Sequence, residues 1–248
     1  QPRILNMHET DIDMSCDTSR RSSESSLGRA IENTIRLALS TLTVPFLVIT
    51  DLIIIGNRLG ERSATEWGQA LLLLVSVVLF AYAAHRRAEA RGFYMLVAGF
   101  FMCCFIRELD LLLDEWLFHG AWAPLAIAVA LLVSARALRV WRTLLPGAVE
   151  FVGTQAFIYV QIGLVVVAML SRSLGSGRQL WFLLGHDDSY RLCKTVIQEA
   201  LESFGYLLIC FGGIILHREL DRGAEAEARG RGTTRRGCAP RASAKHPL

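Results

Sequence analysis

The sequence predicts an all-α fold, a polytopic integral membrane protein whose six transmembrane helices form one bundle. Of its 248 residues 52% are apolar and 20% are charged, whereas soluble domains average about 25% charged and 45–50% apolar residues. The mean hydropathy is +0.38, and the apolar residues are gathered in long runs that contain few charges. This composition excludes disordered, collagen-like and disulfide-stapled proteins.

Each apolar run is matched to the thickness of a bilayer. A hydrocarbon core of about 30 Å requires roughly 20 residues of helix, because each residue rises about 1.5 Å. Pro45 lies inside the first run and is expected to kink that helix, since it removes a backbone donor. The predicted spans are residues 35–56, 69–84, 93–118, 121–140, 156–170 and 195–216.

Polar segments flank the predicted transmembrane domain, which covers residues 31–217. Residues 1–30 form a polar leader that we expect to be flexible. Residues 218–248 are rich in Arg, Gly and Ala and are predicted to form a basic, disordered tail. No aromatic or sequence motif in the tail indicates nucleic-acid binding, so the lipid bilayer is its expected partner.

The distribution of Lys and Arg predicts the orientation. Counted over the segments that flank the six spans, 18 Lys and Arg lie on the side of the termini and 6 on the other side. Basic residues accumulate on the cytoplasmic side of membrane proteins. Both termini are therefore predicted to be cytoplasmic, in a protein of the plasma (inner) membrane.

Charged residues inside the predicted third span are the first candidates for function. Arg107, Asp110 and Asp114 follow at i, i+3 and i+7, which places them on one face of a helix, while Glu108 points to the flank. Arg107 is expected near the middle of the membrane and the carboxylates closer to the outer surface. A charge near the bilayer centre costs a few kcal/mol, so such residues often have a function.

The sixth predicted span supplies a second acidic stripe. Glu199, Glu202 and Tyr206 again follow at i, i+3 and i+7, with Ser203 alongside, and Asp51 ends the first span at a similar depth. Tyr206 and Ser203 are predicted to donate hydrogen bonds within the cluster. The sequence thus predicts a group of carboxylates from several helices in the outer half of the membrane.

The leading functional hypothesis is that this cluster moves or senses a small cation or a proton. Neighbouring buried carboxyl groups cannot all carry charge, so one of them holds a proton that a cation can displace. In this hypothesis Glu202 and Asp110 bind the ion, Arg107 is the counter-ion, and Glu199 and Asp114 form the access path. Glu108 is a further candidate ligand.

A second hypothesis is that the protein is a non-transporting accessory or scaffold subunit. Arg107 would then neutralise two acids and fix the third helix to the sixth, because intramembrane ion pairs also hold helix bundles together. The expected partner is another membrane subunit or a second copy of the chain.

A third hypothesis is a membrane-embedded hydrolase that uses zinc. His119, His186 and Asp187 offer a mixed set of nitrogen and oxygen ligands. The sequence has no His-Glu-x-x-His or His-x-x-x-His spacing, and it lacks nucleotide-binding and nucleophile-elbow motifs. These absences favour a protein that is not an enzyme and binds no cofactor.

Overall fold

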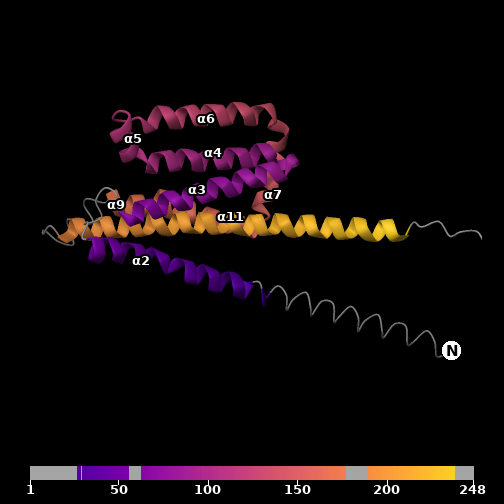
Figure 1. Ribbon diagram of the computed structural model, residues 1–248, viewed down its shortest axis with the longest axis horizontal. Helices are drawn as coiled ribbons and strands as arrows, with labels where there is room; N and C mark the ends of the chain where they lie inside the picture. Colours follow the sequence, from indigo (N-terminus) through magenta and orange to yellow (C-terminus); the bar gives the residue numbers. More distant parts are fainter. Residues whose placement is uncertain (1–26, 29, 56–62, 177–188, 238–248) are drawn as a thin grey trace, which may run out of the picture. The chain divides into compact units, whose positions relative to one another are not determined.

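The computed structural model describes residues 27–28, 30–55, 63–176 and 189–237, and every regular element in these ranges is a helix (Figure 1). The all-α prediction is confirmed for this part of the chain. The chain forms two compact units, Gln1–Phe46 and Leu47–Leu248. The second unit contains almost all of the apolar helices and every candidate site residue that the structure describes.

Helices of three kinds follow one another along the chain. In order they are α2 (Thr43–Ile49), the π-helix η1 (Thr50–Ile55), α3 (Ala64–Arg86), the 3-10 helix η2 (Ala88–Ala90), α4 (Arg91–Glu108), α5 (Asp110–Trp116), α6 (Trp122–Arg139), the 3-10 helix η3 (Trp141–Thr143), α7 (Leu144–Val152), α8 (Gln155–Val165), the π-helix η4 (Val166–Ser171), α9 (Arg172–Ser176) and α11 (Ser189–Gly237).

Five helical segments are long and apolar enough to cross a membrane. They are Ala64–Arg86, Ala88–Glu108, Trp122–Arg139, Gln155–Gly175 and Cys193–Gly223. These segments coincide with the second to sixth predicted spans, although their ends differ by several residues.

The first predicted span, 35–56, is not one continuous helix. Residues 30–41 are helical, Leu42 forms a turn, α2 begins at Thr43, and the backbone becomes a π-helix at Thr50. The interruption lies just before Pro45, whose ring would collide with the carbonyl of Thr41 in a regular α-helix. Gly56 lies outside the described residues.

Two other predicted boundaries differ from the structure. The third span was expected to reach residue 118, but α4 ends at Glu108 and a separate short helix, α5, starts at Asp110. The last helix, α11, extends to Gly237, whereas disorder was expected from residue 218. Composition alone misleads here, because the Arg, Glu, Leu and Ala of this segment are also strong helix formers.

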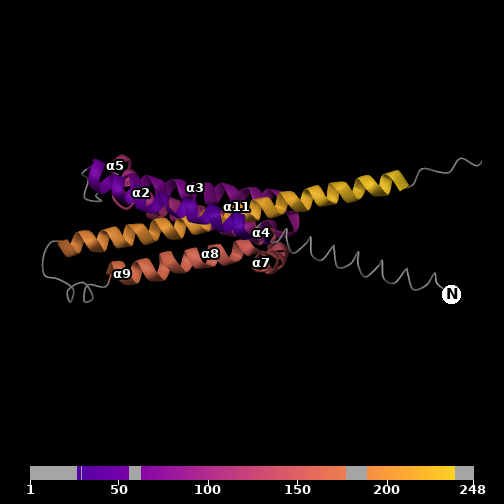
Figure 2. The same ribbon diagram turned by 90° about the horizontal axis from the view of Figure 1, so that it is seen from below.

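The long helices of the second unit pack in the order α6, α4, α3, α11 and α8. Helix α3 lies between α4 and α11, although it is far from α11 in sequence, and α8 covers the other side of α11 (Figures 1 and 2). The short helix α7 packs on α4 and connects to α8. Helix α11 is therefore central and contacts α3, α8 and η4.

Aromatic side chains fill the centre between α3, α4 and α7. Phe80 lies 5.5 Å from Phe101 and 5.9 Å from Phe151 between ring centroids. Tyr94 is also fully buried beside Phe151. The Phe80–Phe151 and Tyr94–Phe151 pairs are edge-to-face, and such pairs add to the stabilisation that burial alone provides.

Apolar side chains also cover much of the outside of the bundle. Helix α6 buries only Ala137, and its other faces expose Leu125, Leu131 and Leu138 among others. Soluble monomers rarely expose contiguous apolar patches of this extent. The exposed faces and the five apolar helices together indicate a membrane protein.

Candidate functional site

The candidate site is built on one face of α11. Glu199, Glu202 and Tyr206 are spaced at i, i+3 and i+7, as the sequence predicts, and Ser203 lies beside them. Glu202, Ser203 and Tyr206 are each less than 5% exposed. The polar groups on this face bond to three neighbouring helices, α3, η4 and α4.

The first set of hydrogen bonds joins α11 to α3. The side-chain amide of Gln69 donates to the carboxylate of Glu199 at 2.9 Å, to the backbone carbonyl of Glu199 at 3.2 Å and to Ser203 Oγ at 3.0 Å. Gln69 is 1% exposed. An amide buried among apolar helices needs such partners, because an unpaired polar group there costs several kcal/mol.

The second set of hydrogen bonds joins α11 to η4. Ser171 Oγ donates to Glu202 Oε1 at 2.8 Å, and the amide of Gln198 donates to the same oxygen at 3.3 Å. Ser171 is fully buried and is the last residue of the π-helix. The wider turn of a π-helix shifts the register of α8, and π-bulges are often found at functional sites.

The third set of hydrogen bonds joins α11 to α4. Tyr206 donates its hydroxyl proton to Glu108 Oε1 at 2.7 Å, and Arg107 Nη1 donates to the same oxygen at 2.9 Å. The side chain of Glu108 is 12% exposed and that of Arg107 is 42% exposed. Arg107 therefore bonds to its sequence neighbour, and its outer part remains accessible.

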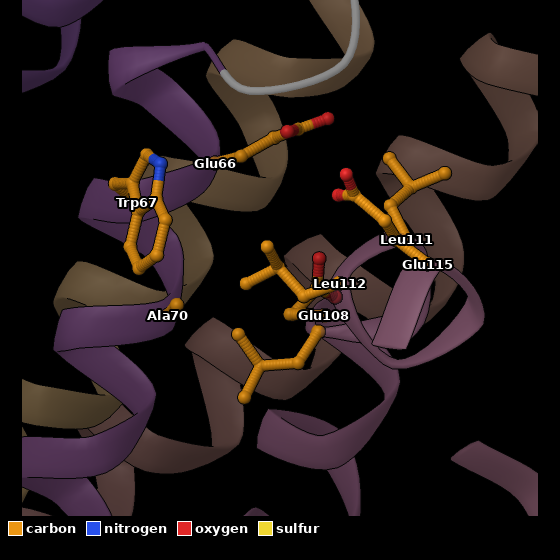
Figure 3. A pocket seen from close by; sticks show the side chains of 8 residues that line it. Glu66, Trp67, Ala70, Glu108, Leu111, Leu112 and Glu115 are labelled. Atoms are coloured by element: carbon orange, nitrogen blue, oxygen red, sulfur yellow. The ribbon is translucent and has the colours of Figure 1, made fainter. Parts of the chain in front are cut away.

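A cavity of about 480 Å³ leads to Glu108 from the surface. It lies between the start of α3 and the junction of α4 and α5, and Glu66, Glu108 and Glu115 contribute carboxylates to its lining. Figure 3 shows the carboxylates of Glu66 and Glu115 directed toward the same space, with Trp67 on one wall. Carboxylates and an indole face together are suited to attract a cation.

The carboxylates outnumber the cationic groups at the buried part of the site. Within the described residues, Arg107 is the only cationic group that is paired with Glu108, Glu199 or Glu202. The remaining partners, Gln69, Ser171, Gln198 and Tyr206, are neutral donors. Three ionised carboxylates beside a single arginine would be costly in this setting, so protons or a bound cation would stabilise the site.

The predicted third span is interrupted between Arg107 and Asp110. Helix α4 ends at Glu108 and α5 begins at Asp110, so the i, i+3, i+7 residues do not lie on one continuous α-helix, although Asp110 stays close enough to interact electrostatically with Arg107. Arg107 lies in the last turn of α4 and not midway along a span, and its partner is Glu108 rather than Asp110 or Glu202.

Asp110 and Asp114 stabilise local turns. Asp110 Oδ1 accepts a hydrogen bond from the backbone N–H of Leu111 at 2.7 Å. Asp114 accepts from the N–H of Gly120 at 2.8 Å and lies 2.7 Å from His119 Nδ1. Gly120 has a φ of +81°, a conformation that favours glycine, so Asp114 secures the turn before α6.

Asp51 is buried, but it forms hydrogen bonds with the start of α3 and is not part of the carboxylate cluster on α11. Its two oxygens accept from the backbone N–H groups of Ala64 at 2.7 Å and Thr65 at 2.9 Å, and Thr65 Oγ1 donates to it as well. These N–H groups lack intrahelical partners at the start of a helix, and a carboxylate there also favours the helix dipole.

The predicted zinc ligands are only partly described. His186 and Asp187 lie outside the described residues, and the side chain of His119 is 99% exposed. Among the described residues, no three His, Cys, Asp or Glu side chains are placed to hold a metal ion.

The sequence interpretation missed several residues of the site. Gln198 stands four residues before Glu202, a spacing that could have indicated its contact. Gln69 and Ser171 come from other helices, so only the packing of α3 and η4 against α11 identifies them. Glu66 and Glu115 were not linked to the cluster, because only the cavity between α3 and α5 brings them to the same space as Glu108.

Known proteins offer no guide to the activity. No family model, no curated protein and no solved structure matches this chain.

Proposed function

We propose that this protein binds a small cation or a proton at the buried carboxylates on α4 and α11 and moves or senses it across the membrane. The observation that carries the proposal is the excess of acids, since Glu108, Glu199 and Glu202 are held mainly by neutral donors. Acidic residues are rare in transmembrane helices, and where they occur they often line ion pathways or proton relays.

The acidic cavity offers a route by which a cation or proton could reach Glu108. Glu66 and Glu115 line it and would raise the local concentration of cations, and Glu108 connects the cavity to Tyr206 on α11. Glu199 and Glu202 lie along the same helix face. A proton or cation arriving at Glu108 would compete with Arg107, which acts as the internal counter-ion.

The proposed topology places the cavity on the outer side of the plasma membrane. The five apolar segments run in alternating directions along the bundle (Figures 1 and 2), so the start of α3 and the end of α11 would lie on opposite sides of a membrane that all five cross. A sixth crossing by the helical residues 30–55 would bring both termini to the cytoplasm, in agreement with the distribution of Lys and Arg.

Ion flux into proteoliposomes tests the proposal. The purified full chain is reconstituted, and proton, sodium and potassium gradients are applied in turn. We expect flux of one of these ions in the wild-type protein and a loss of at least tenfold in Glu202→Gln and in Glu108→Gln. Glutamine keeps the size of the side chain and one acceptor oxygen but removes its charge and its ability to take up a proton.

Glu150→Gln is the matched control. Glu150 pairs with Arg87 at 2.8 Å near the opposite end of the bundle, so its substitution should leave flux unchanged. The absence of flux for all three ions in folded wild-type protein would contradict transport. Isothermal titration of the same ions then tests sensing, and the lack of any binding that depends on Glu202 would contradict the proposal entirely.

A second candidate is an accessory subunit in which the same groups only fix the helices. Specific support comes from the bonding pattern, because Glu199, Glu202 and Glu108 each join α11 to another helix. In that case Glu202→Gln would change the unfolding midpoint but neither flux nor ion binding, and the protein would copurify with a membrane partner.

A further inference from the structure

An apolar groove runs along the bundle between α4 and the α8–η4 helix. It has a volume of about 600 Å³, and α7 closes one end of it. Phe93, Phe100 and Phe157 contribute to its walls, and Gln161 is the only residue of its lining with a polar side chain. Phe100 is 51% exposed, so the groove is open to the surroundings of the bundle.

A second cavity, of about 320 Å³, adjoins the groove at the outer end of α4. The two share Phe100, Phe101, Leu164 and Ala168, so they form one continuous depression. The second cavity differs in its charge, because Arg107 and Arg172 both line it.

The two arginines differ in how far their charge is already compensated. Arg107 is paired with Glu108, and its side chain is 42% exposed. Arg172 is exposed, and within the described part of the chain no side chain forms an ion pair or hydrogen bond with its guanidinium. An anionic group in this cavity would therefore meet at least one cation that has no ion-pair partner among the described residues.

The dimensions fit one leaflet of a bilayer. From Arg107 back to Val97 along α4 is ten residues, or about 15 Å of helix, which is half of a hydrocarbon core of about 30 Å. Val97 lines the apolar groove. A chain anchored at Arg107 would thus run past Phe100 and reach the bilayer midplane within the groove.

We propose that this depression is a binding site for one anionic phospholipid. Its phosphate lies between Arg107 and Arg172, and one acyl chain follows the groove between α4 and α8–η4. Guanidinium groups bind phosphate oxygens through paired hydrogen bonds, and the apolar walls replace neighbouring lipid tails. The proposal rests on membrane insertion, as proposed above, but not on cation binding or transport.

Native mass spectrometry of the full chain in detergent tests the site. The protein is titrated with phosphatidylglycerol or with phosphatidylcholine of the same acyl chains. We expect a single tight site for phosphatidylglycerol and a weaker one for phosphatidylcholine. Arg172→Gln should weaken the first site about tenfold, since hydrogen bonds to charged groups are worth at least that factor.

Ala168→Trp tests the groove separately from the charge. It should block the binding of both lipids by filling the groove where its two parts meet. The matched controls are Ala128→Trp and Arg139→Gln, at exposed positions of α6 away from the groove, and each should keep the first-site affinity within twofold. Circular dichroism of every variant confirms that it is folded.

Three outcomes would overturn the proposal. The first is equal binding of the two lipids by the wild-type protein. The second is unchanged phosphatidylglycerol binding in both Arg172→Gln and the double variant with Arg107→Gln. The third is binding of glycerol phosphate, which has no acyl chains, as tightly as the lipid, since the groove would then contribute nothing.

Discussion

Asp51 shows how a buried charge can serve structure rather than transport. Its carboxylate is fully buried and accepts from two backbone N–H groups and one hydroxyl at the start of α3. Its position at the end of an apolar run is the same feature that made it resemble a member of the carboxylate group. The hydrogen-bond partners of a buried carboxylate, and not its depth in the membrane, therefore distinguish a structural role from a role in ion binding.

We expect Asp51→Ala to destabilise the protein by about 3 kcal/mol, because two buried donors and one partly buried donor lose their acceptor. Equilibrium unfolding in mixed detergent and SDS micelles measures the change. Asp110→Ala is the control and should cost less than about 1 kcal/mol, since Asp110 accepts from a single exposed N–H. Equal effects of the two substitutions would contradict the assignment of Asp51 as the acceptor for the first backbone N–H groups of α3.

At the scale of helices, glycine decides how closely α8 and α11 approach. A Cβ atom on Gly163 would lie 2.6 Å from the carbonyl oxygen of Gly205, and one on Gly205 would lie 2.9 Å from that of Gly163. Gly212 meets the carbonyl of Ala156 in the same way. Small residues commonly allow such contacts between membrane helices.

Gly163→Ala should therefore destabilise the protein by up to about 2 kcal/mol. Alanine gains about 1 kcal/mol of helix propensity, but overpacking against a backbone atom costs about 1–3 kcal/mol and outweighs the gain. Gly153→Ala is the control, because its Cβ would meet its nearest atom, Glu150 O, at an ordinary 3.4 Å. Unfolding in mixed micelles compares the two, and a Gly163→Ala protein as stable as wild type would contradict the close contact.

The break between α4 and α5 matters more for the site than any single residue. It places Asp110 and Asp114 on a separate helix from Arg107, and Glu115 of the same short helix lines the cavity together with Glu66 and Glu108. Helical spacing predicts which residues share a face only while the helix is continuous. The sequence from Ile106 to Trp116 contains no proline or glycine that would announce the break.

At the scale of the whole molecule, the proposed topology makes a direct prediction. In a variant without cysteine, Cys is introduced by His119→Cys in the turn before α6 or by Glu89→Cys in η2. Both positions are exposed and lie at opposite ends of α4. An impermeant maleimide should label His119→Cys in intact cells and Glu89→Cys only after permeabilisation.

The reverse labelling pattern would place the acidic cavity in the cytoplasm and would contradict the orientation. Labelling of both positions in intact cells would contradict membrane spanning by α4. The five long apolar helices are independent of this outcome, because they follow from length and composition.

The sequence by itself determined the helical class, five of the apolar segments and the shared face of Glu199, Glu202 and Tyr206 on α11. These features depend on local periodicity and hydropathy, which each segment carries alone. Only the tertiary structure decided which helices pack against that face, and therefore that its hydrogen-bond partners are Gln69, Ser171 and Glu108. It also decided that Asp51 bonds to the start of α3. Contacts between distant segments arise from packing, and no single stretch of sequence specifies them.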